Sequence, residues 1–146
     1  VGARGRARVR AAGACAGSAG RVGGLAVGRG SLVAGLGDAV TPVRGARPPQ
    51  FGVFPVVAED DPLVLLPKAS EAVAALDTGE GVAVLADLYG ATPCNLAVKL
   101  ASPGRVEVIA GVNLPMLVRA FTYRPKGMDT RVTTSLPGVC VGVLHI

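Results

Sequence analysis

Short apolar runs alternate with segments of helical period from Arg21 to the end of the chain. Each run is mainly apolar and rich in valine, as expected of strands that are covered on both faces. The five predicted strands are Gly24 to Gly28, Phe51 to Val57, Gly81 to Ala86, Arg105 to Ala110 and Val139 to Ile146. Such an alternation of strands and helices is typical of parallel β-α-β units.

Two helices are predicted in the first half of the chain. Ser31 to Val43 is a weak candidate, because two glycines and a proline within it disfavour a helix. The segment after Asp61 is a better one, since its apolar residues repeat every three or four positions up to Leu76. Pro67 is expected to kink this second helix or to delay its start.

Two further helices are predicted to begin at prolines. Thr92 is expected to cap a helix whose first residue is Pro93 and which runs to about Leu100. The other is expected to run from Pro115 to about Tyr123. Proline suits the first helical position, because the N–H that it lacks would have no partner there.

These elements predict an α/β fold. We expect an open, mostly parallel, doubly wound sheet of about five strands in a three-layer α/β/α arrangement. The last strand, Val139 to Ile146, is expected to lie antiparallel at the edge of the sheet.

The composition supports one globular domain. The 146 residues are 50% hydrophobic, 3% aromatic and 17% charged, which is too apolar for wholesale disorder. No apolar run approaches the roughly 18 to 20 residues of a membrane-spanning helix, so a soluble domain is expected. Cys15, Cys94 and Cys140 are far apart and form no Cys-x-x-Cys pair, which argues against disulfides or a zinc site and favours a reducing cytosol.

The charge distribution divides the chain into two parts. Residues 1–50 contain eight Arg and one acidic residue, whereas residues 51–146 contain seven bases and nine acids. Because residues 1–21 show no apolar periodicity, we expect a disordered basic leader there and the folded domain in 22–146. A nucleic-acid-binding arm and a transit-like segment are alternatives for the leader. It lacks lysines and aromatic residues, so no nucleic-acid partner is predicted.

The stretch from Val82 to Leu100 predicts an anion site. Its buried strand ends at Asp87, and ligands of open parallel sheets bind beyond the carboxyl ends of the strands. Free N–H groups at the start of the next helix, with the Thr92 hydroxyl beside them, favour phosphate. The candidate phosphate-binding residues are Gly90, Ala91, Cys94 and Asn95. A small buried thiol is the alternative role for Cys94.

Two sequence blocks in residues 76–124 resemble a known family. They are DLYGATPCN at Asp87 to Asn95 and GVNLPM at Gly111 to Met116. Both are similar to the mannose-family enzyme IIA component of the bacterial phosphoenolpyruvate-dependent sugar phosphotransferase system. The segment PPQFGVFPV and the ending GVLHI extend the resemblance from about Pro48 to Ile146.

The resemblance implies a phosphotransferase that carries a phosphoryl group on a histidine. It would take the group from the histidine-containing phosphocarrier protein and pass it to the IIB component of a sugar permease. Asp87 would hold the ring N–H of that histidine, and the Thr92 hydroxyl would steady the phosphoryl oxygens. Gly111 and Asn113 match a loop at the rim of the crevice, although Asn113 could simply cap a helix.

The same resemblance implies the setting of the protein. The family is cytoplasmic and works beside a membrane permease, and its members form homodimers through the C-terminal strand. It implies no metal and no organic cofactor. The sugar is not indicated.

The chain departs from the family at the phosphate acceptor. The family histidine lies in a Thr-His-Gly sequence just after the first strand, where this chain has Gly28-Arg29-Gly30. Arg29 lies 58 residues before Asp87 and is the best positional match for the acceptor. A guanidinium stays protonated and offers no lone pair for attack on phosphorus, so we expect the chain not to take up phosphate.

Two explanations for Arg29 stay open. One is a natural or sequencing-derived substitution that leaves a transfer-deficient carrier. The other is that residues 1 to about 47 are translated out of frame, which the excess of Gly, Ala and Arg favours.

Two other functions are considered. One is a non-catalytic regulatory subunit that docks IIB or the phosphocarrier. The other is a nucleotide-binding module, suggested by Gly28-x-Gly30 after a strand, but position 33 is Val where that motif needs its third glycine. The resemblance gives His145, the single histidine of the sequence, no catalytic role.

Overall fold

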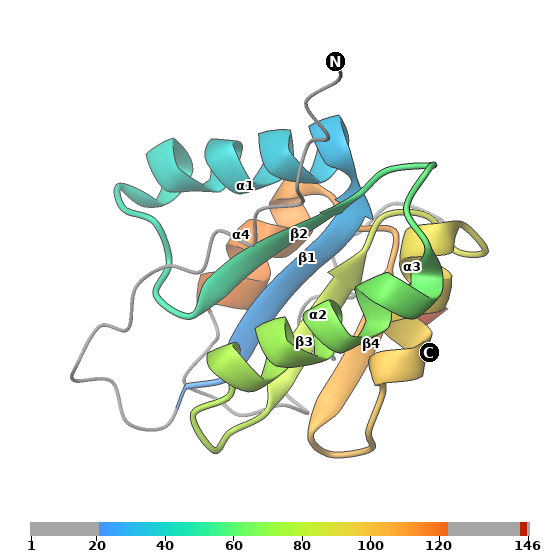
Figure 1. Cartoon of the computed structure of the whole chain (residues 1–146). Helices are drawn as coiled ribbons and strands as arrows, with labels where there is room; N and C mark the ends of the chain where they lie inside the picture. The colour runs from blue at the N-terminus through green and yellow to red at the C-terminus, as the bar shows by residue number, and fades with distance from the viewer. Residues whose placement is uncertain (1–20, 123–143, 146) are drawn as a thin grey trace.

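A sheet with the strand order β2-β1-β3-β4-β5 forms the centre of the computed structural model, which describes residues 21–122 and 144–145 (Figure 1). The strands are β1 (Gly23–Arg29), β2 (Phe51–Val56), β3 (Val82–Ala86), β4 (Val106–Ala110) and β5 (Leu144–His145). β1 to β4 are parallel, which confirms the predicted α/β class. The two residues of β5 pair antiparallel with β4, and the rest of the strand predicted from Val139 lies outside the described residues.

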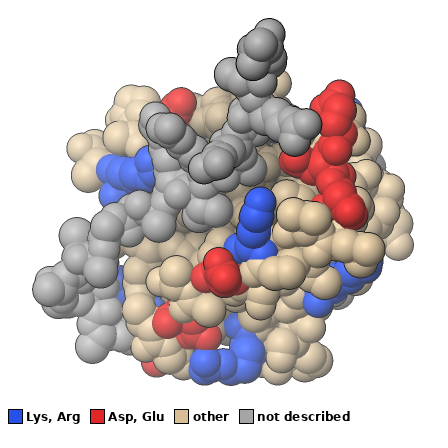
Figure 2. All heavy atoms as spheres, viewed as in Figure 1, with Lys and Arg blue, Asp and Glu red and all other residues tan. Residues whose placement is uncertain are grey.

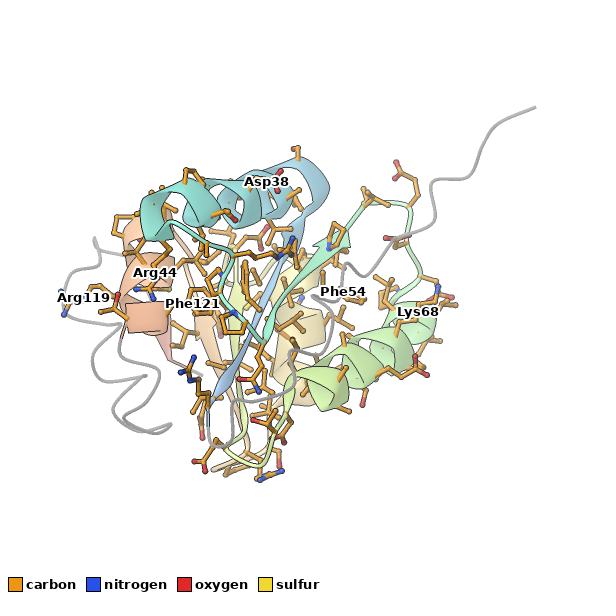
Figure 3. The ribbon with its side chains drawn as sticks, turned by 90° about the vertical axis from the view of Figure 1, so that its left-hand side faces the viewer. Asp38, Arg44, Phe54, Lys68, Arg119 and Phe121 are labelled. Carbon is orange, nitrogen blue, oxygen red and sulfur yellow. The ribbon has the colours of Figure 1, made fainter. Side chains whose placement is uncertain are left out.

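Helices cover both faces of this sheet. α1 (Gly30–Arg44) and α4 (Leu114–Thr122) lie side by side on one face, while α2 (Pro62–Leu76) and α3 (Thr92–Leu100) lie on the other (Figures 1 and 3). Within the described ranges, no helix has the length and apolar character needed to cross a bilayer.

Each face has its own apolar core. Phe51 of β2 packs edge-on against Phe121 of α4, with ring centroids 4.8 Å apart, beneath α1 and α4. Phe54 packs on the opposite face with α2 and α3, because residues three apart in a strand point to opposite sides. Figure 3 labels Phe54 and Phe121 on the two sides of the sheet. This is the predicted three-layer arrangement.

α1 forms as a full helix of 15 residues in spite of its glycines and its proline. Gly37 is buried against β2, where an added Cβ would lie 2.6 Å from the Val53 Cγ2 atom. A small residue is therefore required there, and packing against the sheet compensates for the low helix propensity. The helix ends before Gly45, whose φ of 76° is the left-handed conformation typical of a helix stop.

α2 begins before Pro67, although Pro67 was expected to kink the helix or to delay its start. The Asp61 side chain accepts a hydrogen bond from the Leu63 backbone N–H at 2.9 Å, and Pro62 occupies the first helical position. This cap starts the helix before Pro67, which lies inside it. The expected delay of the helix start was therefore wrong.

β1 is the buried centre of the molecule. It pairs with β2 on one side and β3 on the other, and Leu25, Ala26 and Val27 have no exposed surface. Val33 and Val40 of α1 are equally buried. A segment translated out of frame is not selected to place apolar side chains at such positions. The packing of β1 and α1 therefore counts against the out-of-frame explanation for residues 23–44.

A polar cluster ties the amino ends of β3 and β4 together. The Arg105 guanidinium donates to the Asp77 carboxylate at 2.7 Å and to the Gly79 carbonyl at 2.8 Å. The same carboxylate accepts the backbone N–H groups of Gly79 and Gly81 at 2.8 and 3.1 Å. Asp77 thus orders the loop that leads into β3.

Candidate active site at the carboxyl edge of the sheet

Arg29 and Asp87 come together because β1 and β3 are parallel neighbours. Val27 and Ala86 are in register, so the two strands end at the same edge of the sheet (Figure 1). The Asp87 backbone N–H still donates to the Val27 carbonyl at 3.1 Å. Asp87 therefore lies beside the bend at Gly28 to Gly30.

The Asp87 carboxylate is held by groups on both sides of this edge. Oδ2 accepts the Arg29 backbone N–H at 3.0 Å, and Oδ1 accepts the Leu88 backbone N–H at 2.6 Å. The Arg29 Nε atom lies 3.6 Å from Oδ2 and forms an ion pair with it. The Asp87 side chain is 2% exposed and that of Arg29 is 63% exposed, so a buried anion supports a cation that faces solvent.

Gly28 allows the carboxylate to come this close to β1. A Cβ at this position would lie 3.1 Å from the Asp87 Cβ and 3.2 Å from the Val33 Cβ. A side chain at this position would require Asp87 or Val33 to shift by a few tenths of an ångström. Sequence reasoning considered Gly28 as part of a nucleotide motif and as a departure from the family's Thr-His-Gly. It missed this close approach, because the position of β3 is not visible in the sequence.

The turn after Asp87 differs in one respect from the expectation. Gly90 has a φ of 83°, and Ala91, which adopts an extended backbone, is the N-cap of α3. The Asn95 backbone N–H donates to the Ala91 carbonyl at 2.9 Å, so the helix begins at Thr92 and the prediction of Thr92 as the cap was wrong. Thr92 is exposed and its hydroxyl has no hydrogen bond to Arg29 or Asp87 among the described residues.

The other predicted phosphate-binding residues serve the turn and the first turn of α3. The Asn95 side-chain amide donates to the Gly90 carbonyl at 3.4 Å, which is a weak bond across the turn. Cys94 is 1% exposed. Burial raises the pKa of its thiol, a hydrogen bond with the Gly90 backbone lowers it, and the negative charge of Asp87 raises it. Cys94 is thus the small buried thiol of the alternative interpretation.

The rim residues from the second sequence block close the site from β4. The Gly111 backbone N–H donates to the Asp87 carbonyl at 2.9 Å. The Asn113 side chain accepts the Met116 backbone N–H at 2.9 Å and so caps α4. Met116 and Leu117 of that helix are buried in the core.

Exposed apolar side chains surround this edge of the sheet. They come from the segments that follow β1, β2 and β3, and we call them the apolar rim: Leu32, Val57, Leu63, Val64, Leu88 and Tyr89. Leu63 is 77% exposed and Tyr89 61%, and several exposed apolar side chains at one edge of a sheet are a candidate interaction surface. Sequence reasoning missed the rim; Leu88 and Tyr89, between an acid and a turn glycine, were its visible signal.

An acidic turn borders the apolar rim. Figure 2 shows acidic side chains gathered over the connection between β2 and α2, which contains Glu59, Asp60 and Asp61. Two of them also have local roles, since Asp60 accepts the Val57 backbone N–H at 3.0 Å and Asp61 caps α2.

Comparison with known sequences matches most of the chain, including the residues at this edge of the sheet, to a described family. A family model for the "PTS system fructose IIA component" matches residues 27–133, which include both sequence blocks and Arg29. The "PTS system mannose-specific EIIAB component" of Escherichia coli (strain K12) is 43% identical over 61 residues, which are 41% of this chain and 19% of that protein. The counterpart in Shigella flexneri matches to the same extent. The match thus spans about a fifth of these curated relatives.

Solved structures share the fold. Phosphotransferase system component EIIA from Streptococcus agalactiae has a TM-score of 0.67 and 21% identity, covering 82% of this chain and 95% of that one. The PTS IIA protein of the fucose utilization operon from Streptococcus pneumoniae has a TM-score of 0.70 and 19% identity, covering 85% and 95%. The mannose/sorbose-specific IIA subunit from Enterococcus faecalis has a TM-score of 0.67 and 20% identity, covering 83% and 94%.

The family match begins within β1 and continues through Asp87 and α4, the same elements that build the site. The resemblance inferred from the two sequence blocks is confirmed, and the chain belongs to the mannose-type enzyme IIA family of the sugar phosphotransferase system.

Proposed function

We propose that this chain is an enzyme IIA subunit that docks the histidine-containing phosphocarrier and the IIB component of a sugar permease but does not itself carry a phosphoryl group. The observation that supports this is the pair of Arg29 and Asp87. The residue at the acceptor position is a cation, and it engages the carboxylate that would orient an imidazole.

Nucleophilic attack on a phosphoryl group needs a lone pair on the acceptor atom. A neutral imidazole has one and a guanidinium, which is protonated at every physiological pH, has none. Asp87 supports the acceptor position but has no imidazole to hold. Since phosphoryl transfer depends mainly on positioning and charge stabilisation, loss of the acceptor leaves the rest of the site in place.

The remaining features support docking. The apolar rim follows the carboxyl ends of β1, β2 and β3, the edge of the sheet that carries Arg29, and exposed apolar side chains of this kind mark protein interaction sites where they are contiguous. A subunit of this kind would act in the cytoplasm beside the permease and compete with transfer-competent IIA proteins for the same partners. The homodimer expected from the family also stays a proposal, which light scattering at micromolar concentration tests.

Phosphate transfer tests the proposal directly. The full chain is incubated with radiolabelled phosphoenolpyruvate, the first enzyme of the system and the phosphocarrier. We expect no label on this chain, whereas Arg29→His gains label because the imidazole lies beside Asp87. Labelling of the unmodified chain would contradict the proposal, and loss of that label on His145→Ala would identify His145 as the acceptor.

A further inference from the structure

The guanidinium of Arg29 uses only part of its hydrogen-bonding capacity within the protein. Its Nε atom faces the Asp87 carboxylate at 3.6 Å, while its two terminal nitrogens make no hydrogen bond within the described residues. The side chain is 63% exposed and the supporting carboxylate 2%. The buried anion therefore orients the cation, and the terminal N–H groups of the planar fork face solvent.

The fork has the geometry that recognises phosphoryl oxygens. Arginine donates two parallel N–H bonds to a phosphate, and such charge-assisted bonds are about twice as strong as neutral ones. Asp87 reduces the net charge of the site, but its carboxylate is buried behind the guanidinium. An approaching anion therefore meets the positive end of the pair first.

The backbone around Arg29 does not oppose an anion. α1 begins directly after Arg29, and neither α1 nor α3 has a side-chain cap or an acidic residue in its first turn. α2 and α4, in contrast, are capped by Asp61 and Asn113. The two uncapped helices follow the adjacent strands β1 and β3, which end at the same edge.

From the exposed fork of Arg29 we infer that this site binds a phosphoryl group non-covalently, on the histidine of the phosphorylated phosphocarrier, and discriminates that form from the unphosphorylated one. The inference rests on the proposed docking function and adds a preference to it. No bond to phosphorus forms or breaks. A protein-borne phosphoryl group is favoured over a free anion, because only a protein can also cover Leu88 and Tyr89 of the apolar rim.

Binding measurements with the two forms of the phosphocarrier test this inference. The full chain is immobilised, and the affinity of each form for it is measured by surface plasmon resonance. We expect the phosphorylated form to bind about 10- to 100-fold more tightly, the range that charge-assisted hydrogen bonds provide. Arg29→Gln should remove this preference, so that the two forms bind with equal affinity. Arg29→Lys should keep part of it, since lysine retains the charge and loses the fork.

Arg21→Gln is the matched control, because it removes the same charge from an exposed residue before β1. It should leave the preference intact, and all variants should melt within a few degrees of the parent.

Equal binding of the two forms would overturn the inference and leave the docking function standing. Binding of neither form would overturn both. A preference that survives Arg29→Gln, or millimolar inorganic phosphate that binds as tightly as the phosphorylated protein, would also refute it.

Discussion

The Asp87 carboxylate satisfies two backbone N–H groups while it is almost fully buried. Asp87→Asn keeps the shape but replaces one acceptor oxygen with a donor, so one of these N–H groups loses its partner. We expect the free energy of unfolding to fall by about 1 to 3 kcal/mol, measured by urea denaturation. Asp38→Asn on the exposed side of α1 should stay within about 0.5 kcal/mol. Equal effects of the two variants would contradict the assigned role of Asp87.

The raised pKa of Cys94 predicts that its thiol is alkylated slowly at neutral pH. In a Cys15→Ser, Cys140→Ser background, Cys94 is the single cysteine and its alkylation rate can be followed against pH. Burial keeps the thiol protonated, so half-maximal reactivity should occur at higher pH than for a free thiol, and urea should accelerate the reaction strongly. Half-maximal reactivity at or below the pH of a free thiol would argue for an accessible cysteine.

At the residue scale, the sequence indicated which residues belong to the site better than it indicated the contacts that they make. The resemblance led to Arg29 and Asp87 at the correct spacing, and the structure brings them together. Contacts that depend on the approach of a second strand, such as Gly28 against Asp87, could not be predicted. Thr92 was wrongly predicted as a cap because capping depends on backbone angles, and Ala91 has the extended ones.

Two glycines of α1 provide a test at the scale of the element. Gly35 has open space around its missing side chain, whereas a Cβ on Gly37 would meet Val53 at 2.6 Å. We expect Gly35→Ala to stabilise the protein by about 0.5 to 1 kcal/mol through helix propensity. Gly37→Ala should destabilise it by about 1 to 3 kcal/mol because the core is overfilled.

Thermal melting of both variants measures this difference. The two changes are chemically identical and lie in the same helix, so propensity alone predicts the same sign for both. Stabilisation by Gly37→Ala would show that α1 packs less closely on β2 than the structure indicates.

The positions of the strands were more predictable than the packing and capping of the helices. The limits of β1 to β4 differ from the expected ones by at most one residue at each end, since the apolar runs of β1, β3 and β4 end at glycine or a charged residue. The helical stability of α1 was underestimated, because helix propensity depends on the local sequence and does not include packing against β2. Pro67 was misjudged since Asp61 and Pro62 start α2 before it.

At the scale of the whole molecule, the two edges of the sheet have different tasks. Arg105 and Asp77 join the loops that precede β3 and β4 at the amino edge, whereas Arg29 lies at the carboxyl edge, at the end of β1. Because the Arg105 side chain is 55% exposed, we expect Arg105→Gln to lower the free energy of unfolding by only about 1 kcal/mol. Its affinity for the phosphorylated phosphocarrier should equal that of the parent, in contrast to Arg29→Gln. A loss of affinity would show that the two edges are coupled.

Proline in the outer strand β2 bears on how copies of this protein associate. Among the described strands β2 pairs only with β1, and it contains Pro55. Proline is tolerated in an edge strand where the N–H that it lacks would point away from the neighbour, so this margin presents an interrupted row of donors. Recruitment of a foreign strand, including the first step of fibril growth, is disfavoured on that side. If copies associate by strand exchange, as proposed for the homodimer, we expect them to do so at the opposite margin, beyond β4.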